Sequence, residues 1–286
     1  MVELYKQYQK LLFRLAYQLT GSAADAEDAV QDVFVKVQNM SMERLHEPKA
    51  YLCKMMTNHC IDQLRSARKR RELYIGPWLP EPVYDDSSFE AAEHHETLSY
   101  AMLVLLERLT PAERAVFVLR EALCFDYPAI AELTDKSEQN CRKIMSRAKA
   151  KMGITEEDLI EHGAVQQQWI EQFLGALSQG KVDEVLSLLH EDAILFSDGG
   201  GKVTAAIRPI VSSGRVAQFL LGTIRKAEQE EGGFSVELAT IGGEIGILLR
   251  QDGIVTTATF IQWKQSKAQE IYIVRNPDKL EKLQTK

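Results

Sequence analysis

A glycine run that closes on a lysine, DGGGK at 198–202, could in principle hold a phosphate group. A phosphate-binding loop needs four residues between two glycines and then Lys followed by Ser or Thr, so that backbone N–H groups surround the phosphate and the hydroxyl holds magnesium. In this chain the three glycines are contiguous and Lys202 is followed by Val203. The spacing therefore excludes that kind of nucleotide site.

Three titratable side chains in the same region, His190, Asp192 and Asp198, could perform acid–base chemistry. Such chemistry needs a pKa tuned toward neutrality and a group positioned against substrate. The alternative interpretation is that Asp192 ends a helix-to-strand loop and that His190 lies at a helix terminus. We favour this alternative and expect no enzymatic activity, no catalytic residue, no cofactor and no metal site.

The four cysteines never form a C-x-x-C pair, and Cys53 and Cys60 share one face of a helical pattern. They are interpreted as small core residues in a reducing compartment rather than as metal or redox groups. No apolar run approaches the ~20 residues that a membrane span requires, and the N-terminus MVELYKQYQK lacks a signal-peptide core. We expect a cytoplasmic protein with no membrane partner.

The net charge of −7 over 286 residues argues by itself against a nucleic-acid partner, but the charge is unevenly distributed. Residues 1–72 hold 12 basic and 9 acidic groups, and residues 98–152 hold 9 and 7. Residues 73–97 hold six acidic groups and no basic one. Because clustering matters more than the total for binding a polyanion, the two basic segments are candidate nucleic-acid contacts.

The elements that must position these charges begin with three helices, which apolar spacing predicts up to residue 71. Gly21 closes the first, Ser22 or Asp25 starts the second, and Pro48 opens the third. The third ends in RSARKRR, five cations in seven residues. Beyond it, three prolines and the acidic residues of 73–97 predict an extended linker.

Helical spacing resumes over 98–152 and is best marked in FDYPAIAELTDKSEQNCRKIMSRAKAKM. Asp126 can cap a short helix with Pro128 in its first turn, and Ser137 can cap a second, basic helix. A short helix, a tight turn and a basic second helix with amide residues near its start are typical of a helix-turn-helix, whose second helix enters the major groove of DNA.

The remainder of the chain changes character after Gly153. Two helices broken at Gly180 are expected over 164–189. Period-two or β-rich stretches follow, which predict five strands: Ala193 to Phe196, Phe234 to Ile241, Ile245 to Leu249, Ile254 to Trp263 and Ile271 to Val274. Helices followed by antiparallel strands indicate an α+β domain with a curved sheet.

The order of these modules resembles that of the extracytoplasmic-function (ECF) sigma factors of the sigma-70 family, bacterial subunits that direct core RNA polymerase to promoters. DAEDAVQDVFVKV resembles the family's polymerase-docking helix, and PKAYLCKMMTNHCIDQLRSARKRR resembles its helix for melting and reading the minus-ten element. The stretch from LTPAERAVF to SRAKAKM resembles the domain that reads the minus-thirty-five element. One departure is Asp135, where many relatives carry glycine in the turn; the left-handed conformation tolerates Asp.

This resemblance implies a multidomain chain. The expected domains are sigma region 2 over 1–72, the acidic proline-containing linker over 73–97, a sigma region 4 helix-turn-helix over 98–153, and an α+β cone with a curved antiparallel sheet over 154–286. The last domain resembles the SnoaL-like superfold, which serves elsewhere as a cyclase or isomerase. In a subgroup of these sigma factors it is a built-in regulator.

The resemblance also implies site residues. Contacts to core polymerase, through the clamp of the β′ subunit and the β flap, would involve Asp28, Gln31, Asp32 and Phe34. Promoter DNA would be contacted by Asn58, Arg65, Arg68, Asn140, Arg142, Lys143 and Arg147. Three motifs of the subgroup, WLPEP, DGGGK and NPDKL, imply an interdomain regulatory set: Trp78, Glu81, Asp198, Gly199, Gly200, Gly201, Lys202, Asn276, Pro277 and Asp278.

The glycine loop would then pass close to the WLPEP segment, with Trp78 as a flat apolar anchor and Glu81 as the partner of Lys202. The rival interpretation is an ordinary glycine turn between strands. The alternative function is a helix-turn-helix regulator whose C-terminal domain senses a small molecule or acts as a cyclase-like or isomerase-like enzyme. A small-molecule ligand in that domain stays open as a partner.

Overall fold

The computed structural model describes residues 2–38, 47–84, 98–153, 163–229 and 233–284. Its contacts divide the chain into two compact units. The helical unit comprises residues 1–73, 88–98 and 102–159, and the C-terminal unit comprises residues 74–87, 99–101 and 160–286. The first part of the expected linker therefore groups with the C-terminal unit. No helix in the described ranges is long and apolar enough to cross a membrane.

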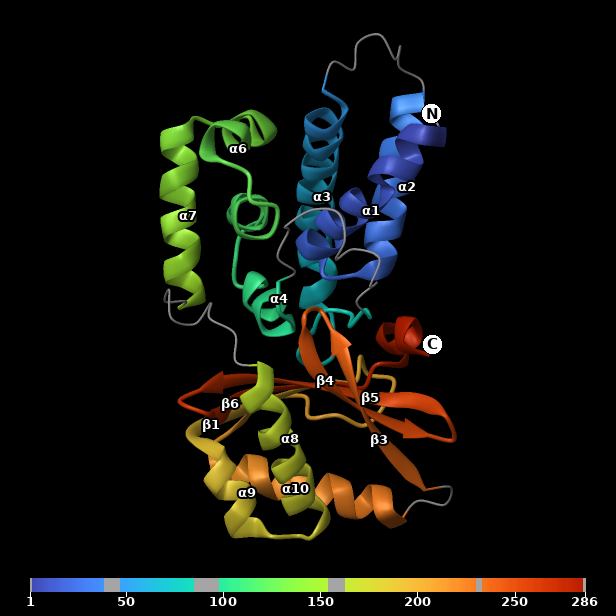
Figure 1. Ribbon diagram of the computed structural model, residues 1–286, viewed down its shortest axis with the longest axis vertical. Helices are drawn as coiled ribbons and strands as arrows, with labels where there is room; N and C mark the ends of the chain where they lie inside the picture. Colours follow the sequence, from blue (N-terminus) through green and yellow to red (C-terminus); the bar gives the residue numbers. More distant parts are fainter. Residues whose placement is uncertain (1, 39–46, 85–97, 154–162, 230–232, 285–286) are drawn as a thin grey trace. The chain divides into compact units, whose positions relative to one another are not determined.

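Three helices open the helical unit: α1 (Val2–Thr20), α2 (Ala23–Gln38) and α3 (Pro48–Glu72). Gly21, at φ +69°, ends α1, and the Ser22 hydroxyl accepts a hydrogen bond from the Asp25 N–H at 3.1 Å to start α2. Of the two caps that the sequence allows, Ser22 is the one used. Each helix buries an apolar stripe, so the three pack side by side (Figure 1).

The rest of the helical unit holds α4 (Tyr100–Leu106), α5 (Pro111–Phe117), a π-helical turn η3 (Val118–Ala122), α6 (Tyr127–Thr134) and α7 (Glu138–Met152). The expected caps of the helix-turn-helix are confirmed, because Asp126 caps α6 and Ser137 caps α7 through their side chains. Asp135 lies between the two helices at φ 52° and ψ 46°, the left-handed conformation expected for it. Buried residues of all these helices join one apolar core with those of α1–α3.

Glu113 links the start of α5 to the end of α7. It forms a capping box with Thr110, and Lys151 donates to both of its carboxylate oxygens at 2.7 Å. Burial opposes ionisation, but the hydrogen bonds from Lys151 and Thr110 outweigh it and lower the pKa of Glu113 below its ordinary value of 4.5. The carboxylate therefore stabilises the fold only while it is charged.

We expect Glu113→Gln to lower the free energy of unfolding of the helical unit by about 1 kcal/mol at neutral pH. Since the folded-state pKa lies below the unfolded one, this stabilisation is present above the unfolded pKa and is lost as pH falls through the lower, folded value. Urea unfolding at pH 7 and near pH 3 checks it. A difference between variant and wild type that is equally large at both pH values would contradict this role.

The C-terminal unit is an α+β cone, as expected. Helices α8 (Gly163–Ser178) and α9 (Val182–Leu188) are separated at Gly180, and α10 (Ser213–Gln229) joins them on one face of the sheet (Figure 1). The strands are β1 (Leu189–Asp198), β2 (Ile210–Val211), β3 (Phe234–Ile241), β4 (Glu244–Gln251), β5 (Ile254–Lys264) and β6 (Lys267–Val274), in the order β2-β1-β6-β5-β4-β3.

The expectation of a curved antiparallel sheet needs one correction. Strands β1 and β6 pair in parallel, whereas the other neighbours are antiparallel. Parallel neighbours need a long connection, and α10 with the β3–β5 meander provides it. The sequence patterns identified five of the six strands, but α10, the two-residue β2 and the terminal 3₁₀ helix η5 (Pro277–Leu283) had not been assigned.

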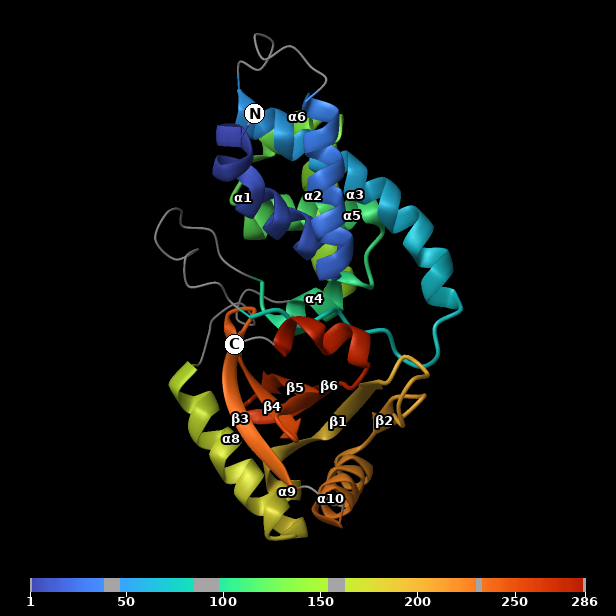
Figure 2. The ribbon, with the colours of Figure 1, turned by 90° about the vertical axis from the view of Figure 1, so that its right-hand side faces the viewer.

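The opposite face of the sheet is covered by the segment 74–84 and by η5 (Figure 2). Tyr100 stacks on Phe260 with ring centroids 3.8 Å apart, and its hydroxyl donates to the Pro80 carbonyl at 2.7 Å. Leu79 is 1% exposed. The proline-rich segment has no helix or strand over residues 77–83, in keeping with its prolines, and it belongs to the C-terminal unit.

Candidate nucleic-acid interface

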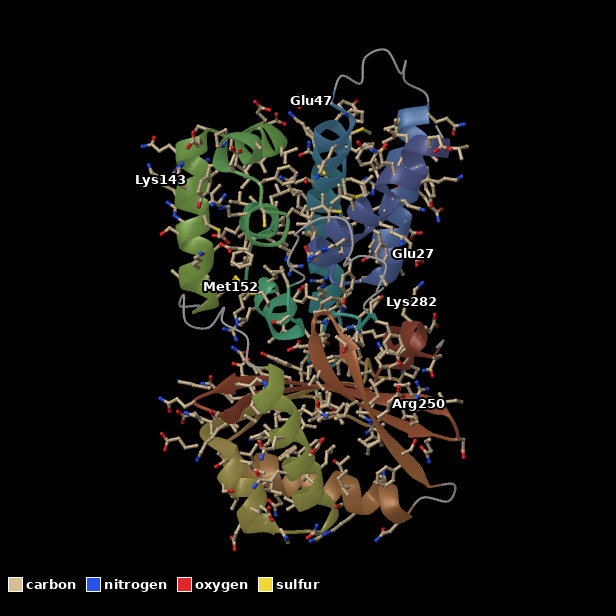
Figure 3. The ribbon with its side chains drawn as sticks, viewed as in Figure 1. Glu27, Glu47, Lys143, Met152, Arg250 and Lys282 are labelled. Carbon is tan, nitrogen blue, oxygen red and sulfur yellow. The ribbon has the colours of Figure 1, made fainter. Side chains whose placement is uncertain are left out.

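Helix α7 is the second, basic helix of the expected helix-turn-helix. Its stripe of five residues at helical spacing is buried: Cys141, Ile144, Met145, Ala148 and Met152. The four expected DNA contacts on this helix are all exposed: Asn140, Arg142, Lys143 and Arg147. Lys143 projects outward from α7 (Figure 3). The helix thus offers amide and cationic groups on the face opposite its core contacts.

Arg142 differs from its cationic neighbours because the protein holds its guanidinium in place. Both Nε and Nη2 donate to Glu138 Oε1, at 3.1 and 2.6 Å. The guanidinium carbon lies 4.2 Å from the centroid of the Tyr127 ring, which also has Arg120 at 5.1 Å. Sequence patterns did not identify Tyr127 as a residue of this site. Its place as the first residue of α6, directly after the Asp126 cap, is the signal that could have indicated it.

The second basic surface lies on α3. Asn58, Asp62 and Arg65 are exposed at helical spacing, so they share one face of the helix, and Arg65 donates to Asp62 at 2.8 Å. Arg68 lies in the same helix, but its side chain falls outside the described part of the structure. Arg71 is not free for DNA, since it donates to the Thr20 carbonyl at 2.8 Å and pairs with Glu107.

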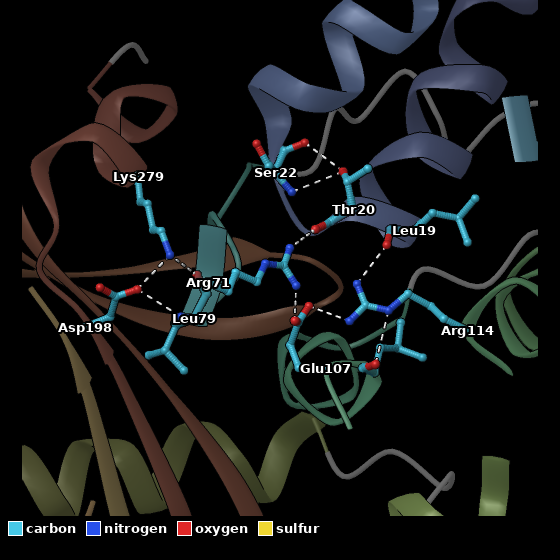
Figure 4. A network of polar contacts seen from close by, with 10 residues as sticks. Leu19, Thr20, Ser22, Arg71, Leu79, Glu107, Arg114, Asp198 and Lys279 are labelled. Atoms are coloured by element: carbon cyan, nitrogen blue, oxygen red, sulfur yellow. Dashed lines mark hydrogen bonds and ion pairs between the residues drawn. The ribbon is translucent and has the colours of Figure 1, made fainter. Parts of the chain in front are cut away.

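The two DNA-facing modules contact each other within the helical unit. Glu107 accepts from Arg71 of α3 and, at 2.5 Å, from Arg114 of α5 (Figure 4). Arg114 is 3% exposed and also donates to the Leu19 carbonyl at 2.8 Å. Elsewhere on α3, Lys54 pairs with Asp135 in the helix-turn-helix turn at 2.5 Å. The contact surface therefore contains a partly buried charged clasp made of Arg71, Glu107 and Arg114.

The expected polymerase-docking helix is α2. Asp28, Gln31 and Asp32 are exposed on it, as a docking face requires. Phe34 is 9% exposed and packs edge-on against Tyr5 at 4.8 Å, so it belongs to the core of the helical unit. Val35, 60% exposed, is the apolar residue that shares the face of the three polar groups. Counting i, i+4 and i+7 from Asp28 would have identified it.

In the C-terminal unit, the glycine-loop Asp198 is a buried hub. It is 0% exposed, and its two oxygens accept from the Leu79 N–H at 2.9 Å and from Lys279 at 2.7 Å (Figure 4). They also accept from the Tyr74 hydroxyl at 2.6 Å and from the Gly200 N–H at 3.0 Å. Lys279 is itself buried and donates to the Leu79 carbonyl at 2.5 Å. One aspartate and one lysine thus hold both backbone polar groups of Leu79.

One expected contact of the interdomain set is corrected by the structure. Lys202 pairs with Asp278 at 2.5 Å and not with Glu81. The ring centroid of Trp78 lies 4.0 Å from the ammonium of Lys279, a partner that the sequence did not indicate. Asp278 and Lys279 both belong to η5, and Lys279 reaches Asp198 at the end of β1. Lys279 was missed, although it lies within the NPDKL stretch.

The glycine loop does pass close to another surface. A Cβ on Gly200 would lie 2.4 Å from Asn276 Nδ2 and 2.9 Å from the Tyr74 hydroxyl, and one on Gly201 would lie 2.8 Å from the Ile75 side chain. Both glycines have positive φ. On Gly199 the nearest atom would be the Val203 carbonyl, at 2.5 Å. The glycines are needed for approach to residues 74–75, just before the WLPEP stretch, and Pro277 opens η5 beside them.

The three groups considered for acid–base chemistry do not meet. His190 and Asp198 lie eight residues apart on β1, about 26 Å at 3.3 Å per residue. His190 Nδ1 accepts from the Asp192 N–H at 3.3 Å, whereas Asp198 is engaged with Tyr74 and Lys279. The helix-covered face of the sheet is packed with aromatic groups, including Trp169, which lies 4.4 Å from Trp263 between ring centroids.

The cysteines fit their expected role with one exception. Cys53, Cys60 and Cys141 are buried, and Cys124 is exposed. Burial, with a smaller contribution from Asp25, raises the pKa of Cys60 to about 12, so it stays a protonated core thiol. Within the described residues no cluster of side chains could hold a metal ion.

Two DNA-facing helical modules on one chain, one of them a capped helix-turn-helix, define a promoter-recognition factor of the sigma-70 class. The family model for sigma-70 region 2 matches residues 4–70, and that for sigma-70, region 4 matches residues 99–152. The chain is 32% identical over 289 residues to the ECF RNA polymerase sigma factor SigJ of Mycobacterium tuberculosis, over 96% of this chain and 91% of that protein. The chain therefore belongs to the ECF RNA polymerase sigma factors.

Two further comparisons agree with this assignment. The probable ECF RNA polymerase sigma factor SigI of Mycobacterium tuberculosis is 28% identical over 190 residues, 65% of each chain. The crystal structure of SigJ from that organism superposes with a TM-score of 0.76 at 27% identity and covers 98% of each chain. As a member of this family, the protein is a transcription initiation factor that binds core RNA polymerase and promoter DNA, and not an enzyme.

Proposed function

We propose that the C-terminal domain regulates this sigma factor in cis by holding both ends of the connector between its two promoter-reading modules. Residues 74–84 follow α3 after Leu73, and residues 99–101 include the first two residues of α4; both stretches belong to the C-terminal unit. At the second end, Glu244 accepts from the backbone N–H groups of Tyr100 and Ala101. The observation that carries the proposal is the buried Asp198–Lys279 pair, which fixes Leu79 at the first end.

The distance between promoter elements makes such a hold consequential. Elements named minus ten and minus thirty-five lie about 25 base pairs apart, roughly 85 Å of DNA at 3.4 Å per base pair. The connector from 74 to 99 has 26 residues and can reach about 90 Å only when fully extended. When one folded domain holds both ends of the connector, the connector cannot span the distance between the two promoter elements. The domain therefore restrains initiation, and release of residues 74–84 removes the restraint.

The family also suggests which surface binds each partner. On core polymerase, the exposed residues Asp28, Gln31 and Asp32 of α2 contact the β′ clamp, and region 4 contacts the β flap. On promoter DNA, Asn58 and Arg65 contact the minus-ten element, and α7 reads the minus-thirty-five element. Arg68 is proposed to join Asn58 on sequence grounds alone. The domain boundaries at 72, 97 and 153 are proposed as functional limits. The protein acts in the cytoplasm, because its partners, core polymerase and DNA, are located there.

Gly200→Ala tests the regulatory hold. Its Cβ would displace the Tyr74 hydroxyl or Asn276, so the transcript level from a cognate promoter should rise with purified core polymerase. Gly180→Ala is the matched control, because Gly180 has φ +66° and nothing within 4 Å of an added Cβ, and both variants carry the strain of about 1–2 kcal/mol of a left-handed residue. Equal transcription from both variants would refute the restraint.

A further inference from the structure

The Arg142 guanidinium is the one cation in the set Arg142, Lys143 and Arg147 that the described structure holds by three contacts. Glu138 Oε1 accepts from its Nε and Nη2, and the Tyr127 ring lies 4.2 Å from its central carbon. Lys143 and Arg147 are exposed on the same helix, with no protein partner among the described residues. Protein contacts therefore orient one of the three cations and not the other two.

The contacts leave one edge of the guanidinium open. Glu138 occupies the side formed by Nε and Nη2, and within the described chain Nη1 has no protein acceptor. The Arg142 side chain is 58% exposed, so the open edge faces solvent. An arginine fork of this kind matches the two acceptors, O6 and N7, that guanine presents in the major groove.

The Tyr127 ring is held firmly enough to act as a platform. It opens α6 directly after the Asp126 cap and packs partly against the core of the helical unit. Arg120 lies 5.1 Å from the same ring and donates to the Phe125 carbonyl at 2.9 Å, which ties the loop before α6 to the preceding helix. The ring is thus fixed on the first helix of the motif, while Arg142 comes from the second.

We propose that Arg142 determines specificity by reading one guanine of the upstream promoter element, and that Tyr127 and Glu138 are its positioning residues. The inference rests on the proposed role of α7 as the upstream reader. Lys143 and Arg147, which the protein does not orient, contact phosphates and add affinity without sequence preference. A fixed guanidinium loses little conformational freedom on binding, which favours its use for base recognition.

The experiment uses the full chain with core RNA polymerase and a promoter library randomised in the upstream element, and it reads base preference from the transcripts. Arg142→Lys keeps the charge and should lower the guanine preference at one position about tenfold or more. Tyr127→Leu and Glu138→Gln should lower the preference at that same position about threefold. Tyr127→Phe keeps the ring and should leave it unchanged.

Lys143→Gln is the matched control on the same helix. It should reduce transcription from all library members alike and lower the salt dependence of DNA binding by about one ion. Glu138 is exposed, so Glu138→Gln tests positioning even where Tyr127→Leu affects folding, which thermal unfolding reports.

Three results would overturn part or all of this assignment. Unchanged guanine preference in Arg142→Lys would show that Arg142 reads no base. Loss of preference in Arg142→Lys, with wild-type preference in both Tyr127→Leu and Glu138→Gln, would remove the positioning roles. Wild-type selection and output in Arg142→Lys, Lys143→Gln and Arg147→Gln alike would reject α7 as the upstream reader, and with it the underlying proposal.

Discussion

Replacing Asp198 by alanine is expected to destabilise the C-terminal domain by about 3–5 kcal/mol, because it leaves the Lys279 ammonium buried without its counter-charge. The same change removes the acceptor of the Leu79 N–H and of the Tyr74 hydroxyl. The segment 74–84 should then open far more often. Hydrogen exchange of the Leu79 amide measures this opening directly and should accelerate on the order of a hundredfold or more.

Two further variants make the Asp198 result specific. Asp192→Ala removes an exposed carboxylate from the same strand and should leave the exchange at Leu79 unchanged. Adding Lys279→Met to Asp198→Ala removes the unpaired charge and should restore part of the lost stability. If the Leu79 amide exchanges as slowly in Asp198→Ala as in wild type, the buried pair does not hold the connector. If the amide exchanges faster but Asp198→Ala initiates transcription no more than wild type, the proposal that the domain restrains initiation is wrong.

Glu107→Gln should destabilise the closed arrangement of the helical unit by about 3 kcal/mol and raise transcription at limiting core polymerase. Glu107 is the carboxylate that accepts from both Arg71 and Arg114, and Arg114 is nearly fully buried. In this arrangement α3 and the helix-turn-helix touch through Lys54 and Asp135. Helix α3 and the helix-turn-helix must therefore separate before they can bind promoter elements that lie some 85 Å apart.

The control for Glu107 is a carboxylate in an ion pair that lies within one module. Glu121 pairs with Lys149 at 3.0 Å, and both residues belong to region 4. Glu121→Gln should leave transcription unchanged, since a partly exposed pair contributes little and spans no module boundary. Transcript levels over a titration of core polymerase compare the two. A rise in both variants, or a fall with Glu107→Gln alone, would contradict the clasp as a restraint on opening.

Local chemistry explains why much of the fold was predictable. Helix caps and glycine stops depend on residues within a few positions of each other, so Gly21, Asp126, Ser137 and the left-handed Asp135 could all be assigned in advance. The buried stripe of α7 follows from its 3.6-residue period. The exposure of Asn140, Arg142, Lys143 and Arg147 follows as its complement.

The same local patterns misplace residues where a second element decides the environment. The resemblance placed Phe34 at the polymerase contact, but Phe34 packs against Tyr5 of α1 in the core, and the adjacent Val35 is the exposed apolar residue. Arg71 belongs to the basic run RSARKRR, which the sequence indicates as a DNA contact, but its side chain pairs with Glu107, 36 residues later in the chain. Helix α10 was not predicted from the sequence; it forms part of the long connection that the parallel pairing of β1 with β6 requires.

The sequence by itself determined the class of this protein, its modules and their order, because motifs and helix periodicity are short-range properties of the chain. Tertiary structure alone decided the partners of the glycine loop. Asp198 meets Leu79 across 119 residues and Lys279 across 81, and Lys202 meets Asp278 across 76. Contacts at such separations depend on where β1, η5 and the extended segment pack, and no local pattern specifies that packing.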